Sequence, residues 1–526
     1  MGADDSLQAK VLNFLGGAKA HGRAPTTIER IETHASIVFL AGDYAYKVKR
    51  AVKYSFVDFS TVEKRRAACL NELRVNRRTA PQLYLDVLPV TVGEGGTLRL
   101  GGEGEAVEWV LRMRRFEQAK LYDRMAEEGR LDLAAMQPLA EVVARFHASA
   151  DRVLSPDRAV VPLDAILRDN AQILAASPDD IPPEAARELA QTSREKLASL
   201  SPLLEARGRG GYVRHCHGDL HLRNIVEIDG APVLFDAIEF DDRLATIDVL
   251  YDLAFLLMDL GKRGLGPHAN ALLNAYLDAS RDTGNLPGLA TLPLFLAMRA
   301  AIRAKVELLR ARKLTQSAGD LARDLARDDA RNYFALAGAL LAPEAARLIA
   351  IGGLSGSGKS AIARAIAPFI GAFPGAVQVR SDVERKRLFG VGPRDRLPPG
   401  AYTADVSDRV YALCRKRALM ALEGGQAVIL DAVHAKPAER EAAASLAAEM
   451  SVPFTGLWLD APRTILRERV AARAGDVSDA TPDVVDAQLG YDIGPLDFAR
   501  IDASLTFEQV LAACLERIGA QPSAPR

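Results

Sequence analysis

The stretch IAIGGLSGSGKSAIARAI, residues 349–366, joins an apolar run to a glycine-rich turn and then to a helix-forming run. Its centre fits the pattern G-x-x-x-x-G-K-[ST], in the required place between a strand and a helix. The glycines let backbone N–H groups converge on phosphate oxygens, and the helix start adds partial positive charge. The residues expected to bind a nucleotide are Gly353, Leu354, Ser355, Gly356, Ser357, Gly358, Lys359 and Ser360. Lys359 would reach the β- and γ-phosphates, and the Ser360 hydroxyl would bind Mg²⁺.

Downstream of this loop, short apolar runs alternate with helical ones. Five runs read as strands, at 347–353, 376–382, 426–432, 452–462 and 500–507. Strands separated by helices predict a parallel sheet with crossover connections. Pro343 precedes the first strand, so we expect an α/β P-loop domain over residues 343–526.

Polar residues at the ends of these strands are candidates for chemistry. Asp382 follows the second strand and could take a proton from an acceptor hydroxyl, or it could be a helix N-cap. Asp431 ends the apolar run AVILD and could hold Mg²⁺ through water. Arg469 and Arg473 are four residues apart, so they share one helix face. They could stabilise the transferring phosphoryl group, or they could simply be a solvated face.

A second informative stretch is RHCHGDLHLRNIV, residues 214–226. Asp219 and Asn224 are five residues apart, the offset of the kinase pattern H-R-D-x-x-x-x-N. In that pattern the aspartate orients or deprotonates the attacking hydroxyl, and the asparagine oxygen binds Mg²⁺. Asp236 ends the apolar run APVLFD and would supply a second metal ligand. His217 has either an orienting or a packing role.

The region before this stretch predicts two lobes. Strands are expected at 35–52 and 83–116, with a helix over 60–80 that begins at the N-cap Ser60. From about residue 131 the pattern is helical, apart from a strand-rich island at 212–240. We therefore expect an α+β, protein-kinase-like domain over residues 1–342, with a small β lobe and a large α lobe.

The HGD form of the motif resembles aminoglycoside phosphotransferases and related small-molecule kinases. The segments ARFHASA (144–150) and IDVLYDLAFLLMDL (247–260) are similar to that family too. The resemblance implies a strand lysine paired with a helix glutamate, for which Lys47 and Glu72 are the candidates. Lys49 is the alternative, because it points to the same strand face. It also implies a hinge for adenine at residues 112–116, although no G-x-G-x-x-G loop precedes Lys47.

The region 345–520 resembles small P-loop kinases, including gluconate kinases, zeta-toxin-like kinases, chloramphenicol phosphotransferase and polynucleotide kinase. This resemblance implies a five-stranded parallel core, an acceptor near Asp382 and Arg385, and a lid that carries Arg469 and Arg473. The order of the two domains resembles a bacterial family in which an aminoglycoside-phosphotransferase-like domain is fused to an ATP-binding domain.

Composition narrows the function further. The chain has 526 residues and a formal net charge of −1, so no overall field favours nucleic acid or an anionic membrane. Its four cysteines lack metal-ligand spacing, which indicates reduced thiols in a cytoplasmic protein. The N-terminus is a poor signal peptide, and no apolar run of about 18 residues suggests a membrane span.

These observations predict a Mg-ATP-dependent phosphotransferase with two nucleotide sites. Each site would transfer the γ-phosphate of ATP to a hydroxyl group of a small molecule. In one alternative, the P-loop domain is a polynucleotide or nucleoside 5′-hydroxyl kinase. In another, the first domain is a non-catalytic, nucleotide-binding regulator.

Overall fold

The computed structural model describes residues 3–22, 27–33, 35–53, 57–314, 320–392, 395–472 and 478–520. It divides into two compact units: residues 1–159 with 208–252, and residues 160–207 with 253–526. The second unit thus combines helices from before and after the HGD stretch with the P-loop region. The expected domain boundary between residues 342 and 343 stays a prediction.

The first unit is built on a six-stranded antiparallel sheet with the strand order β1-β2-β3-β6-β4-β5. The strands are β1 (Ile28–Glu32), β2 (Ser36–Ala41), β3 (Tyr44–Lys49), β4 (Tyr84–Val92), β5 (Leu98–Leu100) and β6 (Ala106–Arg114). The expected strands are confirmed, and β1 is an additional edge strand that the sequence pattern did not indicate.

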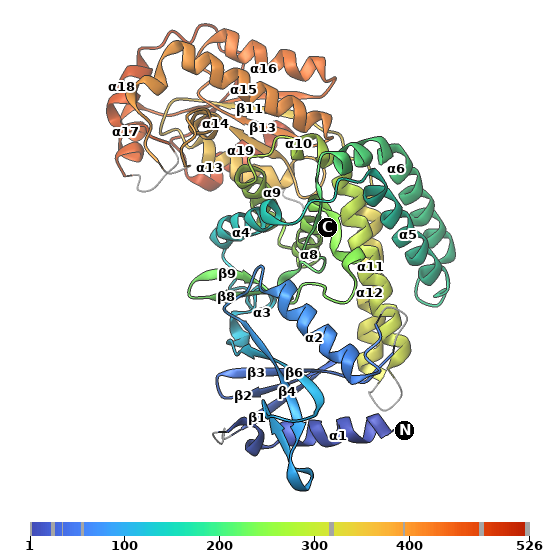
Figure 1. Ribbon diagram of the computed structural model, residues 1–526. Coiled ribbons are helices and arrows are strands. Elements are labelled where there is room, and N and C mark those ends of the chain that lie inside the picture. Colours follow the sequence, from blue (N-terminus) through green and yellow to red (C-terminus); the bar gives the residue numbers. More distant parts are fainter. Residues whose placement is uncertain are drawn as a thin grey trace. The chain divides into compact units, whose positions relative to one another are not determined.

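Two helices cover this sheet, α1 (Ala3–Leu15) and α2 (Val62–Asn76), and they lie on opposite faces (Figure 1). Val48 belongs to the buried cluster that contains Val11 of α1, whereas Ala45 belongs to the cluster that contains Cys69 of α2. Successive side chains of a strand point to opposite faces of the sheet. The apolar residues of β3 therefore pack on one face against α1 and on the other face against α2.

The start of α2 corrects one expectation. The N-cap is Thr61, whose side chain accepts a hydrogen bond from the Lys64 N–H at 3.4 Å. Ser60 had been expected at that place, but its hydroxyl donates instead to Asp58 Oδ1 at 2.6 Å. The serine is therefore used in the preceding turn, and the helix begins one residue later.

The HGD stretch lies between two short strand pairs in the first unit, as the strand-rich island predicted. β7 (Val213–His215) pairs with β10 (Thr246–Asp248), and β8 (Ile225–Ile228) pairs with β9 (Ala231–Leu234), both antiparallel. The nearby helices are α3 (Tyr122–Glu127), α4 (Met136–Ser149) and α7 (Asp242–Ala245). Asp219 thus lies in a loop whose two ends are fixed by strand pairing.

The chain has further helices before the P-loop region. They are α5 (Pro156–Ala175), α6 (Pro183–Arg209), α8 (Val249–Lys262), α9 (Gly266–Ala279), α10 (Asn285–Gly288), α11 (Leu292–Lys313) and α12 (Asp320–Leu341). The long helices α11 and α12 run side by side (Figure 1).

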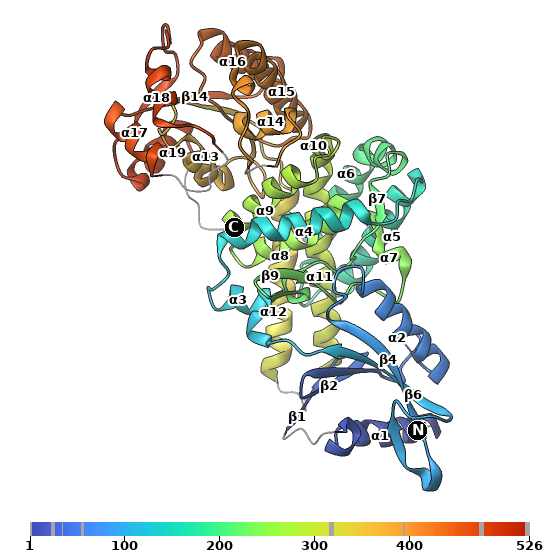
Figure 2. The same ribbon diagram turned by 60° about the vertical axis from the view of Figure 1, so that its left-hand side comes forward.

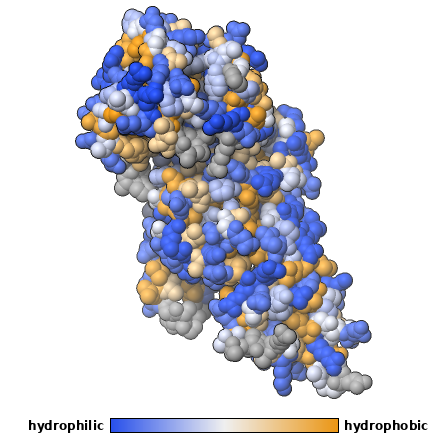
Figure 3. All heavy atoms as spheres, turned by 90° about the vertical axis from the view of Figure 1, so that its left-hand side faces the viewer, coloured by the Kyte–Doolittle hydropathy of each residue, from blue (hydrophilic) through white to orange (hydrophobic). Residues whose placement is uncertain are grey.

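One helical segment, 285–313, is long and apolar enough to cross a membrane by length and composition alone. However, 78% of its apolar window is buried inside the structure, which is the usual state of a core helix. On the face shown in Figure 3, hydrophilic and hydrophobic residues are intermixed.

The P-loop region forms a five-stranded parallel sheet with the order β12-β13-β11-β14-β15, which confirms the expected fold. Its strands are β11 (Leu348–Gly352), β12 (Val377–Arg380), β13 (Val428–Asp431), β14 (Phe454–Asp460) and β15 (Ala499–Asp502). The helices among them are α13 (Lys359–Ile366), α14 (Ser381–Leu388), α15 (Ala404–Glu423), α16 (Pro437–Glu449), α17 (Arg463–Ala471), α18 (Pro482–Leu489) and α19 (Phe507–Ile518). Ile349 and Ile351 of the central strand pack in one apolar cluster with Ile362 of α13 and Val510 of α19.

Helix α9 covers the edge of this sheet within the second unit. The amides of Asn270 and Asn274 each donate to Ala376 O at 3.1 Å, and Gln378 N donates to Asn274 Oδ1 at 2.7 Å. Asp278, one turn further, pairs with Arg387 of α14 at 2.7 Å. An exposed sheet edge is otherwise free to pair with another chain, so these asparagines protect β12 and support the helix that carries Asp382.

Candidate nucleotide-binding sites

The first site is organised around a buried glutamate. Lys47 Nζ of β3 lies 2.7 Å from Glu72 Oε1 of α2 and 2.9 Å from Asp236 Oδ1. The Glu72 side chain is fully buried, whereas that of Asp236 is 43% exposed. The structure therefore brings together three residues that are widely separated in sequence, and it leaves the Asp236 carboxylate open to a ligand.

Lys49, the alternative to Lys47, belongs to the same network. Its Nζ lies 2.6 Å from Glu72 Oε2 and also pairs with Glu239. Burial alone would lower the pKa of Lys47, but Asp236 and Glu72 together raise it well above its usual value. Burial would likewise raise the pKa of Glu72, but the two ammonium groups outweigh it and lower that pKa. Lys47 is the lysine that contacts Asp236, and Lys49 is the more deeply buried partner.

We expect Glu72→Ala to destabilise the first unit by about 3–5 kcal/mol, because two buried ammonium groups would lose their shared carboxylate. Urea unfolding followed by fluorescence measures this change. The matched control is Glu32→Ala, which breaks an exposed ion pair with Arg30 on the same sheet and should change stability much less. Equal effects of the two variants would show that the Glu72 network does not stabilise the fold.

The HGD loop has a conformation that requires its glycine. Gly218 has φ 82°, and a Cβ there would lie 2.9 Å from Ile238 Cδ1. The backbone N–H groups of Gly218 and His217 donate to the buried Asp252 carboxylate at 2.8 and 3.1 Å. His147 Nε2 lies 3.1 Å from the same carboxylate. Asp252 therefore fixes the loop that presents Asp219.

Asp219 and Asn224 are in direct contact at the end of this loop. Asn224 Nδ2 donates to Asp219 O at 2.9 Å and to Asp219 Oδ2 at 3.0 Å. The side-chain nitrogen of Asn224 makes both of these hydrogen bonds, and the Asn224 side-chain oxygen remains available for a metal ion. His221 Nε2 lies 3.3 Å from Asp219 Oδ2.

Hydrogen bonds connect the HGD loop to the strand that ends at Asp236. His217 Nε2 lies 3.0 Å from Phe235 O, and Phe235 N donates to Asn224 O at 3.0 Å. Burial lowers the pKa of His217, which favours a neutral ring. Asp236 has φ 60°, in the left-handed region of the backbone map. Few residues other than glycine adopt this conformation, but aspartate and asparagine do so more often than the rest. Asn224 and Asp236 thus offer two oxygen donors of the kind that Mg²⁺ prefers.

A cleft of about 770 Å³ opens beside the expected hinge. It is lined by Gly42, Asp43, Tyr44, Arg114, Arg115, Phe116, Glu117, Gln118 and Ala119. The cleft overlaps the segment 112–116 that was expected to contact adenine.

In the second site, the glycine-rich loop joins β11 to α13. Gly353 and Gly356 have φ 135° and 88°, and a Cβ on either would lie 2.5 Å from a backbone oxygen. Gly358, with φ 91°, is the N-cap of α13. Lys359 Nζ donates to Leu354 O at 3.0 Å, so the ammonium group folds over the loop that a phosphate would enter.

Two carboxylates lie beside the loop at the ends of neighbouring strands. Arg380 of β12 is in register with Asp431 of β13, and its Nε lies 3.5 Å from Asp431 Oδ2. Asp382 is the second residue of α14, and the N-cap of this helix is Arg380. Burial, followed by the charge of Asp431, raises the pKa of Asp382. Its position inside the first turn differs from that of an N-cap, the alternative role expected for it.

The raised pKa of Asp382 predicts a conflict between stability and activity. A carboxyl group whose pKa is raised on folding stabilises the fold when it is protonated, below its unfolded value of 3.8. That contribution is lost as the pH rises through the raised value, so the buried charge costs stability at neutral pH. We therefore expect Asp382→Asn to melt at a higher temperature than the unmodified protein at pH 7, and the difference to shrink toward pH 4.

The same substitution should reduce turnover at the P-loop site by about 10²–10⁴-fold, as expected for loss of a general base. Thermal unfolding and phosphoryl-transfer assays across this pH range measure both effects. A lower melting temperature at pH 7 together with unchanged turnover would contradict both assigned properties of Asp382.

The arginines of the expected lid are only partly described. Arg469 Nη1 donates to Ala503 O at 2.8 Å, and no contact with the loop residues 353–360 is observed for it. Arg473 lies outside the described residues. The structure therefore brings Asp382 and Asp431 to the loop but does not place Arg469 there.

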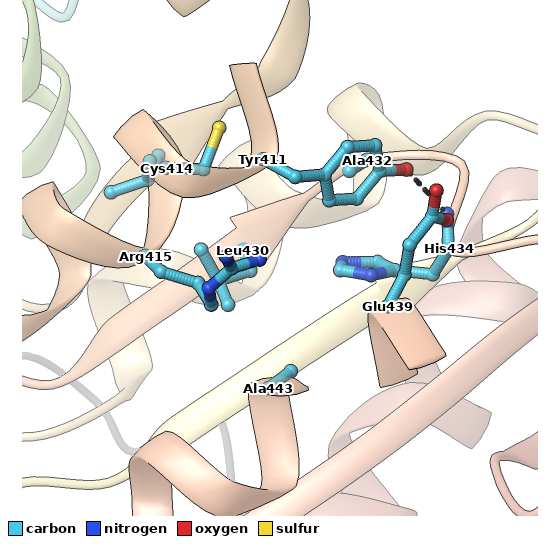
Figure 4. Close-up of a pocket in the computed structure, with 9 residues that line it drawn as sticks. Tyr411, Cys414, Arg415, Leu430, Ala432, His434, Glu439 and Ala443 are labelled. Carbon is cyan, nitrogen blue, oxygen red and sulfur yellow. Dashed lines mark hydrogen bonds between the residues drawn. The ribbon is translucent and has the colours of Figure 1, made fainter. Parts of the chain in front are cut away.

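A small cavity lies behind the strand that ends at Asp431. His434 and Tyr411 line it, together with Cys414, Arg415 and Glu439 (Figure 4). His434 N donates to Tyr411 Oη at 3.0 Å, and burial lowers the pKa of His434 to about 4. The hydrogen bond from the His434 backbone to Tyr411 supports the turn after Asp431, which sequence reasoning had not singled out.

Comparisons with known proteins agree with this division of sites. A phosphotransferase enzyme family model matches residues 43–289, and an AAA domain model matches residues 348–491. Uncharacterized proteins of Mycobacterium tuberculosis (strain H37Rv) and Mycobacterium bovis are 32% identical over 477 residues, which cover 88% of this chain and 90% of each relative.

Solved structures similar to parts of the chain include several kinases. A choline/ethanolamine kinase family protein from Mesorhizobium loti has 18% identity and a TM-score of 0.40, over 64% of this chain and 94% of that one. The GDP complex of aminoglycoside 2′-phosphotransferase-IIIa has 17% identity and a TM-score of 0.34, over 62% and 98%. An APS kinase of Mycobacterium tuberculosis, in complex with AMPPNP and APS, has 18% identity and a TM-score of 0.25, over 34% and 99%.

The fold and the two matched models define a protein with two kinase-like domains, the first of phosphotransferase type and the second of P-loop type. The chain belongs to the bacterial family, shared with these mycobacterial relatives, in which an aminoglycoside-phosphotransferase-like domain is followed by a P-loop domain.

Proposed function

We propose that the chain is a cytoplasmic, Mg-ATP-dependent phosphotransferase with two nucleotide sites, each of which transfers the γ-phosphate to a hydroxyl group of a small molecule. The observation that carries the proposal is the pair of separately assembled lysine sites, Lys47 between Glu72 and Asp236, and Lys359 on the glycine-rich loop. The two lie in different units, so each has its own supporting structure.

In the first site, Lys47 would hold the phosphates of a nucleotide whose adenine lies at the hinge cleft. Asn224 and Asp236 would hold Mg²⁺, which neutralises charge on the phosphates when bound. Asp219 would orient the acceptor hydroxyl and accept its proton. The hydrogen bond from Asn224 Nδ2 to Asp219 Oδ2 supports these roles, because the base would then lie next to a ligand of the metal that binds the phosphates.

In the second site, Lys359 and the loop N–H groups would hold the phosphates, with Ser360 and Asp431 as candidates for Mg²⁺. Asp382 would take the proton of the acceptor hydroxyl. Arg385, three residues further on α14, is 7% exposed, and among the described residues no carboxylate pairs with it. Since an unpaired buried cation is costly, an acceptor that carries an anionic group fits this site best.

A radiolabelled-ATP screen of bacterial metabolites tests the proposal. It should be run on the full chain, on Asp219→Asn and on Lys359→Ala, so that each labelled product is assigned to one site. We expect each product to be lost in only one of the two variants. If label reaches no alcohol, or appears only on nucleic acid in a strongly salt-dependent manner, the proposal fails.

A further inference from the structure

The glycine-rich loop is contacted by a glutamine from the C-terminal part of the chain. Ser355 N donates to Gln488 Oε1 at 2.8 Å. Gln488 lies on α18 and is 8% exposed, and within the described residues its side chain makes no other hydrogen bond. A carboxamide has two N–H donors as well as its oxygen, so both donors of Gln488 remain available next to the loop.

This contact is supported by packing. Leu354 of the loop packs against an apolar cluster of Leu466, Val470 and Val485, which come from α17 and α18. A Cβ on Gly356 would lie 2.5 Å from Leu466 O, so the loop and α17 approach closely. The two helices lie side by side (Figure 2). The backbone at Gln488 is therefore held in place by its neighbours.

Ion pairs fasten α17 to α18 in the same region. Asp486 of α18 pairs with Arg463 at 3.0 Å and also with Arg467, both of α17. Asp486 lies two residues before Gln488 but makes no contact with the loop that the structure records. It therefore offers a control that perturbs the helix pair without touching the contact itself.

Gln488 and Lys359 bind the two ends of one peptide group. Lys359 Nζ donates to the oxygen of the Leu354–Ser355 peptide, and Gln488 accepts from its N–H. Lysines at this place in the P-loop reach the β- and γ-phosphates. The oxygen and the N–H of a trans peptide point in opposite directions, so Lys359 and Gln488 hold this part of the loop from its two sides. A terminal phosphate at the loop would lie between them, where the N–H groups of Gln488 can reach it.

The segment before α18 contacts the acceptor side of the same site. The Ser478 side chain hydrogen-bonds with Asp382, and Tyr402 Oη donates to Asp479 Oδ2 at 2.9 Å. Lys386 Nζ lies 3.5 Å from Asp479 Oδ1. Residues 478–488 thus connect the candidate base and the glycine-rich loop.

We propose that Gln488 is a positioning residue for the γ-phosphate of the nucleotide bound at the glycine-rich loop, to which its carboxamide donates a hydrogen bond. This inference rests on the proposed function, in which the loop binds ATP. ADP has no γ-phosphate, so a hydrogen bond from Gln488 to this group can form with ATP but not with ADP. Gln488 therefore contributes to the affinity for ATP and leaves the affinity for ADP unchanged.

Calorimetric titration of the full chain tests this, with Asp236→Ala as background to remove a metal ligand of the first site. The ligands are Mg²⁺ with ADP and Mg²⁺ with the β,γ-imido analogue of ATP. We expect Gln488→Leu to weaken binding of the analogue roughly 10- to 100-fold, the value of a hydrogen bond to a charged group. ADP affinity should stay within about twofold, which also reports that the loop is folded.

Two further variants sharpen the result. Gln488→Glu should weaken the analogue more than Gln488→Leu, because it adds repulsion between a carboxylate and the phosphate. Asp486→Asn should leave the ratio of the two affinities unchanged. Equal losses for ADP and the analogue, or no loss, would overturn the role of Gln488 while leaving the nucleotide site intact. If the Asp236→Ala chain binds neither ligand, the P-loop part of the proposed function fails with it.

Discussion

Lys359→Ala is expected to lower phosphoryl transfer at the P-loop site by at least about 100-fold, the scale seen when one preorganised donor to a developing charge is removed. Lys359 is the ammonium group of the glycine-rich loop, and its recorded hydrogen bond is to Leu354 O in that same loop. The loop conformation depends on its glycines and on packing at Leu354, so the fold should survive the substitution.

Turnover of the acceptor assigned to the P-loop site measures this effect, alongside thermal unfolding. The matched control is Lys416→Ala, which removes an exposed lysine from α15 in the same unit. The product assigned to the first site should be unchanged in both variants. Full activity in Lys359→Ala would show that the loop does not bind the reacting nucleotide.

Asp219→Asn is expected to reduce transfer at the first site by about 10²–10⁴-fold, the usual contribution of a general base. Asparagine keeps the size of the side chain and retains an oxygen to accept the hydrogen bond from Asn224 Nδ2. Nucleotide binding at Lys47 and Asp236 should therefore persist. Turnover and nucleotide affinity, measured on the same preparation, separate loss of the base from loss of the site.

The control for this prediction is Asp229→Asn, an exposed residue in the turn between β8 and β9. Its φ of 52° is one that asparagine tolerates, so little change is expected. If Asp219→Asn leaves all turnover intact while Lys359→Ala abolishes it, the first unit is a nucleotide-binding regulator and the second is the catalyst.

The parts of the fold that could be predicted from sequence are those set by local signals. The glycine-rich loop lies between an apolar strand and a helix, and the alternating runs after it require crossover connections, so the parallel sheet follows. The strands of the first sheet were predictable from their apolar alternation. β1 was missed because its sequence IERIE carries three charged residues and two apolar ones at uneven spacing.

The network around Glu72 shows where sequence reasoning stopped. Lys47 and Lys49 share a strand face, and alternation cannot separate them. The structure shows that both bind Glu72 and that only the partners on the other side differ, Asp236 for Lys47 and Glu239 for Lys49. These second carboxylates belong to a segment about 190 residues further along the chain, so the local sequence cannot show which of them pairs with which lysine.

The contacts of Gln488 and Arg469 illustrate the same limit. Gln488 is 133 residues from Ser355, and a single glutamine on a short helix carries no motif. The helical spacing left open whether Arg469 acts on the phosphoryl group or belongs to a solvated face, and its guanidinium donates a hydrogen bond to the backbone oxygen of Ala503. Both contacts join residues far apart in the sequence, which local pattern does not encode. By contrast, Asp252 lies in the segment 247–260 that already carried the family resemblance.

The most direct test of the central claim is the number of nucleotides that one chain binds. Calorimetric titration of the full chain with Mg²⁺ and the β,γ-imido analogue of ATP should give two equivalents, and Lys359→Ala should leave one. A single equivalent in the unmodified chain, or none, would contradict the assignment of a separate triphosphate site to each unit.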